Sequence, residues 1–232
     1  MFGNHDYFGL NPQAEIDYYK QHRDNRWTFP DYQYTRVWNV PGSDLTLQIV
    51  FINTPALCPD AEAGTGPEAI PWPKNGVTQR FIWQPTLQWI ENALQASTAD
   101  ILMVAGHYHA YTNTAGDSNP PTTEAVCIQK HLVPLLKKYR VTAYLQGHEN
   151  NLEHLFVDGV NYINSGHGSD YTDPLNPYTP PGLLFNSTVG GFAAMYISGA
   201  QMNFSFIDYM GNHIYEASLN NPRLRRNLRA KN

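Results

Sequence analysis

The 232-residue sequence lacks any apolar run approaching the roughly 18 residues that a membrane-spanning helix needs, so a membrane-spanning protein is not expected. The chain is also poor in charged residues, which make up 15% of it, and rich in aromatic residues, which make up 13%. Disordered chains show the opposite balance, with few aromatic residues and high net charge. The composition and length therefore predict a folded chain with a substantial core, organised as a single domain over residues 1–232.

Several common motifs are missing as well. The chain contains no glycine-rich phosphate loop, no Gly-x-Ser-x-Gly elbow and no Cys-x-x-Cys pair. Nucleotide-loop, serine-hydrolase and thiol-redox functions therefore have no motif support. The only two cysteines are Cys58 and Cys127, and composition alone does not decide between a disulfide and two buried thiols.

Positive charge is scarce outside the C-terminus. The net charge is −5, and five of the fifteen Lys and Arg residues lie in the last ten positions: Arg223, Arg225, Arg226, Arg229 and Lys231. Because the rest of the chain is strongly acidic, a nucleic-acid partner is not expected. We interpret the basic tail as a solvated terminus rather than a polyanion-binding arm. At the other end, residues 1–7 lack the charged and apolar regions of a signal peptide.

Hydrophobic periodicity predicts an α/β (α+β) chain, a layered β-sandwich flanked by helices. A helix is expected over residues 11–22, capped by the side chain of Asn11. Residues 33–39 and 45–52 should pair as a hairpin. The second of these strands alternates, which predicts one core-facing side formed by Leu45, Leu47, Ile49 and Phe51.

The middle of the chain predicts strands joined by helices. A surface loop is expected over residues 58–80 and a helix over 84–95, followed by a buried apolar strand over 101–107 that ends at a histidine. A helix with Ile128, Leu132, Leu135 and Leu136 facing inward, kinked by Pro134, should lead to a strand over 141–146.

The last third predicts antiparallel strands. A hairpin is expected over residues 156–163, a loop over 166–183, and three strands between 191 and 219.

Three polar segments share one local context. Gly3-Asn4-His5-Asp6 opens the chain, and Gly106-His107 and Gly147-His148 each follow an expected strand. Loops at the carboxyl ends of strands gather the sites of α/β sheets, and we expect the glycines to let the backbone turn there. Imidazole nitrogens and an amide oxygen can bind a divalent ion jointly, although two histidines and one asparagine form an incomplete set of ligands.

In their order along the chain, these segments resemble the calcineurin-like metallophosphoesterases, and more narrowly the purple, tartrate-resistant acid phosphatases. The resemblance rests on Gly3-Asn4-His5-Asp6, on residues 104–108 and on residues 142–148, and it spans nearly the whole chain. It implies a binuclear metal centre, iron with iron or zinc, that hydrolyses phosphate monoesters or phosphoproteins. It also implies a secreted or lysosomal location.

The resemblance assigns roles residue by residue. It implies that Asn4, His107 and His148 bind the second, divalent metal. It implies that His5 faces the substrate phosphate and protonates the leaving group. His109, two residues beyond His107, is either a substrate contact or a solvated side chain.

Two departures from the family pattern stand out. The family's aspartate, metal-bridging aspartate and tyrosine would precede Gly3, so we interpret Met1 as a truncated start and expect the N-terminal strands to be lacking. In addition, Asn150 stands where the pattern has a histidine that binds the first metal. We therefore expect at most one divalent metal in this chain and little or no phosphatase activity from it alone. The alternative is a non-catalytic relative, an extracellular binding or structural protein.

The resemblance also bears on covalent modification. It implies a disulfide between Cys58 and Cys127, and a secretory route that would suit the sequons at Asn186 and Asn203. We expect Asn186 to lie in a loop and to be the credible glycosylation site, whereas Asn203 should lie in a strand with Phe204 and Phe206 facing inward.

Overall fold

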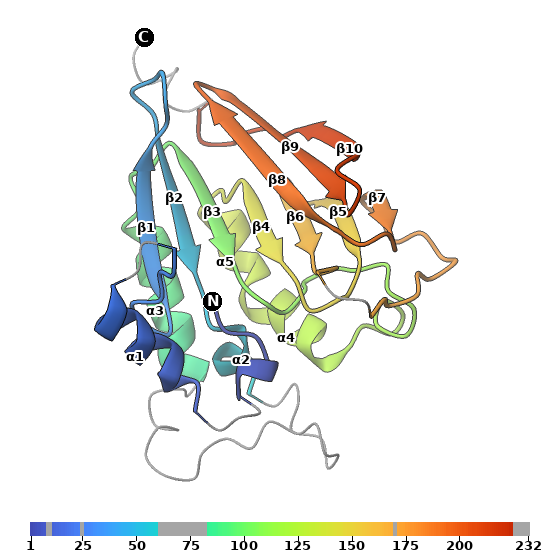
Figure 1. Ribbon diagram of the computed structural model, residues 1–232, viewed down its shortest axis with the longest axis horizontal. Helices are drawn as coiled ribbons and strands as arrows, with labels where there is room; N and C mark the ends of the chain where they lie inside the picture. The colour runs from blue at the N-terminus through green and yellow to red at the C-terminus, as the bar shows by residue number, and fades with distance from the viewer. Residues whose placement is uncertain (8–10, 24–25, 60–82, 169–170, 225–232) are drawn as a thin grey trace.

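A seven-stranded sheet forms the centre of the molecule (Figure 1). The computed structural model describes residues 1–7, 11–23, 26–59, 83–168 and 171–224. In spatial order the large sheet contains β1 (Tyr34–Asn39), β2 (Thr46–Phe51), β3 (Ile101–Ala105), β4 (Ala143–Gln146), β6 (Val160–Ser165), β5 (Leu152–Val157) and β7 (Leu183–Ser187). Strands β2, β3, β4 and β6 run parallel, so their carboxyl ends lie at one edge.

Helices cover one face of this sheet and a second sheet covers the other. The helices are α3 (Trp83–Gln95), α4 (Thr123–His131) and α5 (Val133–Lys138). The second sheet pairs β8 (Gly191–Ser198), β9 (Gln201–Asp208) and β10 (His213–Ser218). Each interface contains its own cluster of buried apolar side chains. The predicted layered fold, with two packed sheets flanked by helices, is confirmed.

A third, smaller cluster anchors the N-terminal segment. Phe2 and Tyr7 pack with Phe29 and Tyr32 beside α1 (Gln13–His22) and the 3₁₀ turn η1 (His5–Tyr7). The predicted helix over 11–22 is thus present, but the Asn11 cap is wrong, because Pro12 occupies the capping position and no side chain bonds to the free amides. The anchored cluster holds the segment with Asn4 against the end of the large sheet, beside α2 (Thr54–Leu57) (Figure 1).

Strand β2 is buried on both faces, which corrects the prediction of a single core side. Val50 is fully buried under the helices, whereas Leu47 and Ile49 pack partly buried against the small sheet. A strand between two layers needs apolar residues at every position, so its alternation carries little information about burial.

Most other predicted elements are confirmed. The helix near 128–136 divides at Leu132 into α4 and α5, with Pro134 in the first turn of α5. The expected hairpin around residues 158–159 and the three C-terminal strands are present. The predicted loop over 58–80 and the basic tail fall largely outside the described residues. None of the described helices is both long and apolar enough to cross a membrane.

Strand β7 was not predicted, and it changes the setting of one sequon. Asn186 lies in this edge strand, paired with Glu153 of β5, so the expectation of a loop at Asn186 is wrong. Asn203 lies in β9 with Phe204 and Phe206 buried beside it, as predicted.

Cys58 and Cys127 form a disulfide, as the family resemblance implied. The bond joins residues 69 positions apart in sequence, with their Cα atoms 6.0 Å apart. It ties the end of α2 to α4 across the end of the large sheet.

Candidate metal and phosphate site

Three polar segments meet at the carboxyl ends of β3 and β4. His107 follows β3 and His148 follows β4, and the backbone amide of Gly147 donates to the carbonyl of His107 over 3.0 Å. Asn4 reaches the same place from the anchored N-terminal segment. Parallel pairing of β3 with β4 explains why residues 41 positions apart become neighbours.

The three polar side chains converge on one point. The Oδ1 of Asn4 lies 2.9 Å from the Nε2 of His107, and this Nε2 lies 3.2 Å from the Nδ1 of His148. Ligand atoms bound to one ion at about 2.0–2.2 Å lie roughly 3 Å from each other, so this donor set fits a single divalent ion. No group of three or more His, Cys, Asp or Glu with metal-binding geometry occurs in the described part of the chain, so these two histidines need the asparagine oxygen.

Burial, together with the neighbouring His148, His5 and His109, lowers the pKa of His107 to about 3. The ring is therefore neutral over the whole physiological range. A neutral imidazole is the form that binds a metal ion.

The backbone around His107 is fixed by its neighbours. The Oγ1 of Thr54 accepts hydrogen bonds from the backbone amides of His107 and Tyr108, and the Tyr144 hydroxyl donates to the Tyr108 carbonyl over 2.7 Å. A Cβ on Gly106 would lie 2.5 Å from that hydroxyl oxygen. Gly106 thus permits close packing rather than the sharp turn we expected from it.

His148 takes the strained conformation instead of the glycine before it. Its φ is +75°, in the left-handed region that few residues other than glycine adopt. Strain of this kind costs about 1–3 kcal/mol and persists where surrounding contacts enforce it. Here it turns the imidazole toward Asn4 and His107.

A cavity of about 630 Å³ opens over the three side chains. Its described lining contains four carboxylates, which belong to Asp6, Asp117, Glu149 and Asp173, and it contains no Lys or Arg. The other described lining residues are Met1, Gly3, Asn4, His5, His107, His148, Asn150 and Tyr171. Four carboxylates repel a phosphate group unless a cation neutralises them. The charge of this cavity therefore suits a metal ion first and an anion only afterwards.

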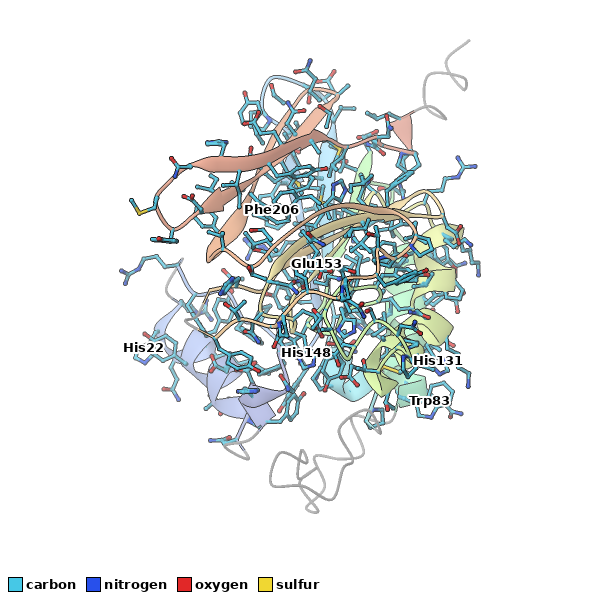
Figure 2. The ribbon with its side chains drawn as sticks, turned by 90° about the vertical axis from the view of Figure 1, so that its right-hand side faces the viewer. His22, Trp83, His131, His148, Glu153 and Phe206 are labelled. Carbon is cyan, nitrogen blue, oxygen red and sulfur yellow. A yellow bond between two sulfur atoms is a disulfide. The ribbon has the colours of Figure 1, made fainter. Side chains whose placement is uncertain are left out.

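The remaining predicted residues take different places. His5 is exposed and lines the cavity next to Asn4. His109 is fully buried, so the expectation that it could be a solvated side chain is wrong. Its Nδ1 lies 2.9 Å from the Oε1 of Glu149 without the geometry of a hydrogen bond. Its ring stacks on the ring of His148. Figure 2 shows His148 near the centre of the view, away from His22 and His131 at opposite edges.

Asn150 is held as a hydrogen-bond donor. Its backbone amide and its Nδ2 both donate to the Oδ2 of Asp173, over 2.6 and 3.0 Å. In the described part of the chain, Asn150 therefore presents an amide where the family pattern has a histidine, with its Nδ2 turned to Asp173.

Sequence reasoning missed the acidic residues of the cavity. Burial, together with the nearby charge of Glu149, raises the pKa of Asp117 to about 6. Burial would also raise the pKa of Glu149, but contacts with His109 and Thr114 outweigh it and the net pKa is lowered. Glu149 follows His148 directly and could have been suspected, whereas Asp117 and Asp173 lie in long loops without a motif.

Glu153 is a fully buried carboxylate just behind the cavity. It accepts hydrogen bonds from the Thr112 hydroxyl and the Asn113 amide over 3.0–3.1 Å. Burial raises its pKa to about 7, and the charge of Glu149 adds to this effect. Figure 2 places Glu153 near the centre of the molecule.

The raised pKa of Glu153 predicts a loss of stability as pH rises. Between pH 4.5, the ordinary pKa, and pH 7 the folded chain binds this proton more tightly than the unfolded chain, so the contribution of Glu153 to the free energy of unfolding falls by roughly 3 kcal/mol across that window. The lowered pKa of His107 contributes with the opposite sign, so the fall is measured as the difference between Glu153→Gln and the unaltered chain in urea unfolding at pH 5 and pH 7. That difference should change by roughly 3 kcal/mol between the two pH values, whereas Asp44→Asn, at an exposed site between β1 and β2, should behave as the unaltered chain does. An unchanged pH profile in Glu153→Gln would contradict the assignment.

Comparison with known proteins shows the family to which the chain is related. The family model described as calcineurin-like phosphoesterase matches residues 1–151. The rat tartrate-resistant acid phosphatase type 5 is 32% identical over 94% of this chain, and the match covers 65% of that relative's length. The chain thus spans just under two thirds of the relative.

Solved structures show the same fold. The Plasmodium protein described as "GAP50 the anchor in the inner membrane complex" aligns with a TM-score of 0.70 at 21% identity, covering 90% of this chain and 62% of that one. A purple acid phosphatase from yellow lupin seeds aligns with a TM-score of 0.59 at 14% identity, covering 84% of this chain and 33% of that one.

Proposed function

Because the chain belongs to the calcineurin-like phosphoesterase family, we propose that it is an acid phosphatase that hydrolyses phosphate monoesters with the aid of bound metal. Asn4, His107 and His148 would hold one divalent ion. The observation that carries this proposal is the convergence of their three donor atoms, with successive separations of 2.9 and 3.2 Å, at the base of an acidic cavity.

The chain's own residues support this chemistry in distinct ways. A bound divalent ion supplies charge stabilisation for the phosphoryl oxygens and makes a water molecule more acidic. His107 offers a lone pair because it stays neutral. His5, exposed beside Asn4, is placed to give a proton to the departing alcohol oxygen. Glu149 orients the buried His109, which stacks beneath His148.

The finer part of the proposal concerns metal number. The chain would bind one divalent ion and retain only the second-metal half of a binuclear centre, since Asn150 donates to Asp173. Weak turnover by this chain alone follows from that half-site. A secreted or lysosomal location belongs to the same proposal, and the Cys58–Cys127 disulfide supports it because disulfides persist in oxidising compartments.

A zinc titration of the metal-stripped chain tests the proposal. We expect one zinc ion per chain by isothermal titration calorimetry, and slow hydrolysis of p-nitrophenyl phosphate at acid pH that depends on added metal. Absence of zinc binding would refute the proposal. Rapid hydrolysis in the presence of a chelator would refute it equally, because the four carboxylates of the cavity cannot hold a phosphate alone.

A second function, a non-catalytic binding or structural protein, is favoured by one observation. The side chain of Asn150 is committed to Asp173, so the cavity is stable in its altered form. The fold likeness to an inner-membrane-complex anchor fits such a role without demonstrating it. This alternative predicts an intact fold with at most one metal ion and no turnover.

The variant Asn150→His separates the two functions. A histidine at position 150 would lie beside Asp173, whose carboxylate could orient a metal-binding imidazole. Loss of such an orienting carboxylate typically lowers metal affinity or activity by about 10–100-fold. In a longer version of the chain that carries the family's two upstream aspartates and tyrosine, we expect Asn150→His to raise metal-dependent turnover at least about tenfold if the phosphatase is crippled at this position. Asn203→His, at an exposed site on β9, is the matched control and should change nothing. Unchanged turnover in Asn150→His with normal zinc binding would favour the non-catalytic function.

A further inference from the structure

A mostly buried carboxylate lies beside His148, one of the candidate metal ligands. The Oε1 of Glu124 lies 3.6 Å from the Nε2 of His148. The exposed fractions of the two side chains are 14% for Glu124 and 21% for His148. His148 lines the candidate metal cavity, whereas Glu124 is not among the lining residues in the described part of the chain. The carboxylate of Glu124 therefore faces the histidine from outside the cavity.

The two ring nitrogens of His148 face different groups. Its Nδ1 lies 3.2 Å from the Nε2 of His107, inside the donor set of the candidate metal site. Its Nε2 faces Glu124. A neutral imidazole carries a proton on one nitrogen and a lone pair on the other, and the partner of one nitrogen decides which form is present. An ionised carboxylate only accepts hydrogen bonds, so Glu124 favours the form with the proton on Nε2 and the lone pair on Nδ1.

Helix α4 sets the position of Glu124. Glu124 lies in the first turn of this helix, and the Oγ1 of the capping residue Thr122 accepts a hydrogen bond from the backbone amide of Ala125 over 3.4 Å. The same hydroxyl lies 3.5 Å from the Nε2 of His109, whose ring stacks on the ring of His148. The start of α4 thus contacts two stacked histidines, one through Thr122 and the other through Glu124.

The same helix is tied to the segment that carries His107. Cys127, three residues after Glu124, forms the disulfide with Cys58 at the end of α2. Within α2, the Oγ1 of Thr54 accepts a hydrogen bond from the backbone amide of His107 over 3.2 Å. A covalent bond and a hydrogen bond therefore link the helix of Glu124 to the metal donor set, and they limit how far the carboxylate can move away from it.

Burial makes the contact between Glu124 and His148 effective. An exposed carboxylate and imidazole attract each other weakly, because water and salt screen them. Around a mostly buried pair the effective dielectric constant is lower, so the attraction is stronger. A metal ion on Nδ1 strengthens it further, because the ion withdraws electron density from the ring and leaves the Nε2 proton more positive. Carboxylates placed behind metal-binding histidines typically alter metal affinity or activity by about 10–100-fold.

We propose that Glu124 is a positioning residue of the candidate metal site. Its carboxylate holds the His148 ring with the proton on Nε2, so that the lone pair on Nδ1 points at the metal position beside His107. Asn4, His107 and His148 remain the ligands, and Glu124 acts on the metal through His148. The inference rests on the proposed function and adds to its metal site a residue that neither the sequence motifs nor the family resemblance assigned.

The variant Glu124→Gln removes the charge and keeps the shape of the side chain. We expect the variant to bind zinc at least about tenfold more weakly than the unaltered chain, measured by isothermal titration calorimetry after the metal is stripped. Glu91→Gln on α3 is the matched control, because this change breaks an ion pair with Lys138 at 2.7 Å and Glu91 does not line the cavity. The control should bind zinc within twofold of the unaltered chain. Equal zinc affinity in Glu124→Gln and the unaltered chain would overturn the inference.

A spectroscopic readout separates positioning from a merely structural role. A negative charge in the first turn of α4 also stabilises the helix, so a lower Tm in Glu124→Gln would not by itself show positioning. Long-range ¹H–¹⁵N NMR of the chain in excess zinc detects the Nε2 proton of His148. We expect this proton to exchange with water at least tenfold faster in Glu124→Gln than in the unaltered chain or in Glu91→Gln. Weaker zinc binding with unchanged proton exchange would also overturn the inference, because the carboxylate would then act by charge or helix stability alone.

The zinc titration of the unaltered chain separates this inference from the proposed function. Absence of zinc binding there would refute the proposed metal site, and the role of Glu124 with it. Zinc binding to the unaltered chain with no change in Glu124→Gln would refute the role of Glu124 and leave the proposed function standing. Zinc binding that weakens in Glu124→Gln but not in Glu91→Gln, together with faster exchange of the His148 proton, supports both.

Discussion

Replacing His107 with alanine should abolish tight zinc binding. The ring supplies the central atom of the donor set, because its Nε2 is close to both the Asn4 oxygen and the His148 nitrogen. Zinc sites with four protein ligands release about 10–16 kcal/mol on binding, so one ligand carries roughly 3 kcal/mol, or about a hundredfold in affinity. Calorimetric titration of the metal-stripped variant measures the loss directly.

A distant histidine provides the control for this variant. His22 lies at the end of α1 and its ring contacts Tyr18 rather than the cavity (Figure 2). His22→Ala should bind zinc as the unaltered chain does. Far-ultraviolet circular dichroism of both variants checks that the fold persists. Zinc affinity within twofold of the unaltered chain in His107→Ala would contradict the assigned ligand set.

Removal of the Cys58–Cys127 disulfide should lower the free energy of unfolding more than any other change that we propose. The bond closes a loop with a sequence separation of 69, and loop-closure entropy gives roughly 4 kcal/mol for a loop of this size. For a chain of this length that corresponds to a fall in Tm of about 10 °C. Cys58 belongs to the core beneath the helices and Cys127 packs against it, so alanine at both positions leaves a small void but introduces no buried polar group.

Thermal unfolding with and without reductant measures the contribution of the disulfide. Reductant should lower the Tm of the unaltered chain and leave the Tm of Cys58→Ala/Cys127→Ala unchanged. A Tm that does not respond to reductant in the unaltered chain would show that the loop is held by other contacts. The comparison does not depend on metal, because neither cysteine lines the candidate site.

The sequence by itself predicted that His107 and His148 would lie together. Parallel strands with polar residues at their carboxyl ends bring those residues to one edge, so the pattern of residues alone was enough to place these two side chains. Asn4 was grouped with them because its segment has the same polar, glycine-containing context, although no strand precedes it in the described residues. Its position in space depends on the packing of Phe2 and Tyr7 in a separate cluster.

Other features depended on long-range contacts that a local pattern does not contain. Strand β7 forms because β5 offers it an unpaired edge, and a five-residue segment after a loop carries no strong signal of its own. His109 and Glu149 come within 2.9 Å of each other only in the folded chain, and Asp117 joins the cavity from the loop before α4.

The sequence alone thus determined the class of fold, the strand ends at which the polar residues gather and the asparagine in place of a histidine at position 150, because these depend on periodicity and on residue identity. Tertiary structure alone decided that Asn150 donates to Asp173 and that four carboxylates share one cavity. Such features arise where loops distant in sequence meet, and that meeting is fixed by packing rather than by local preference.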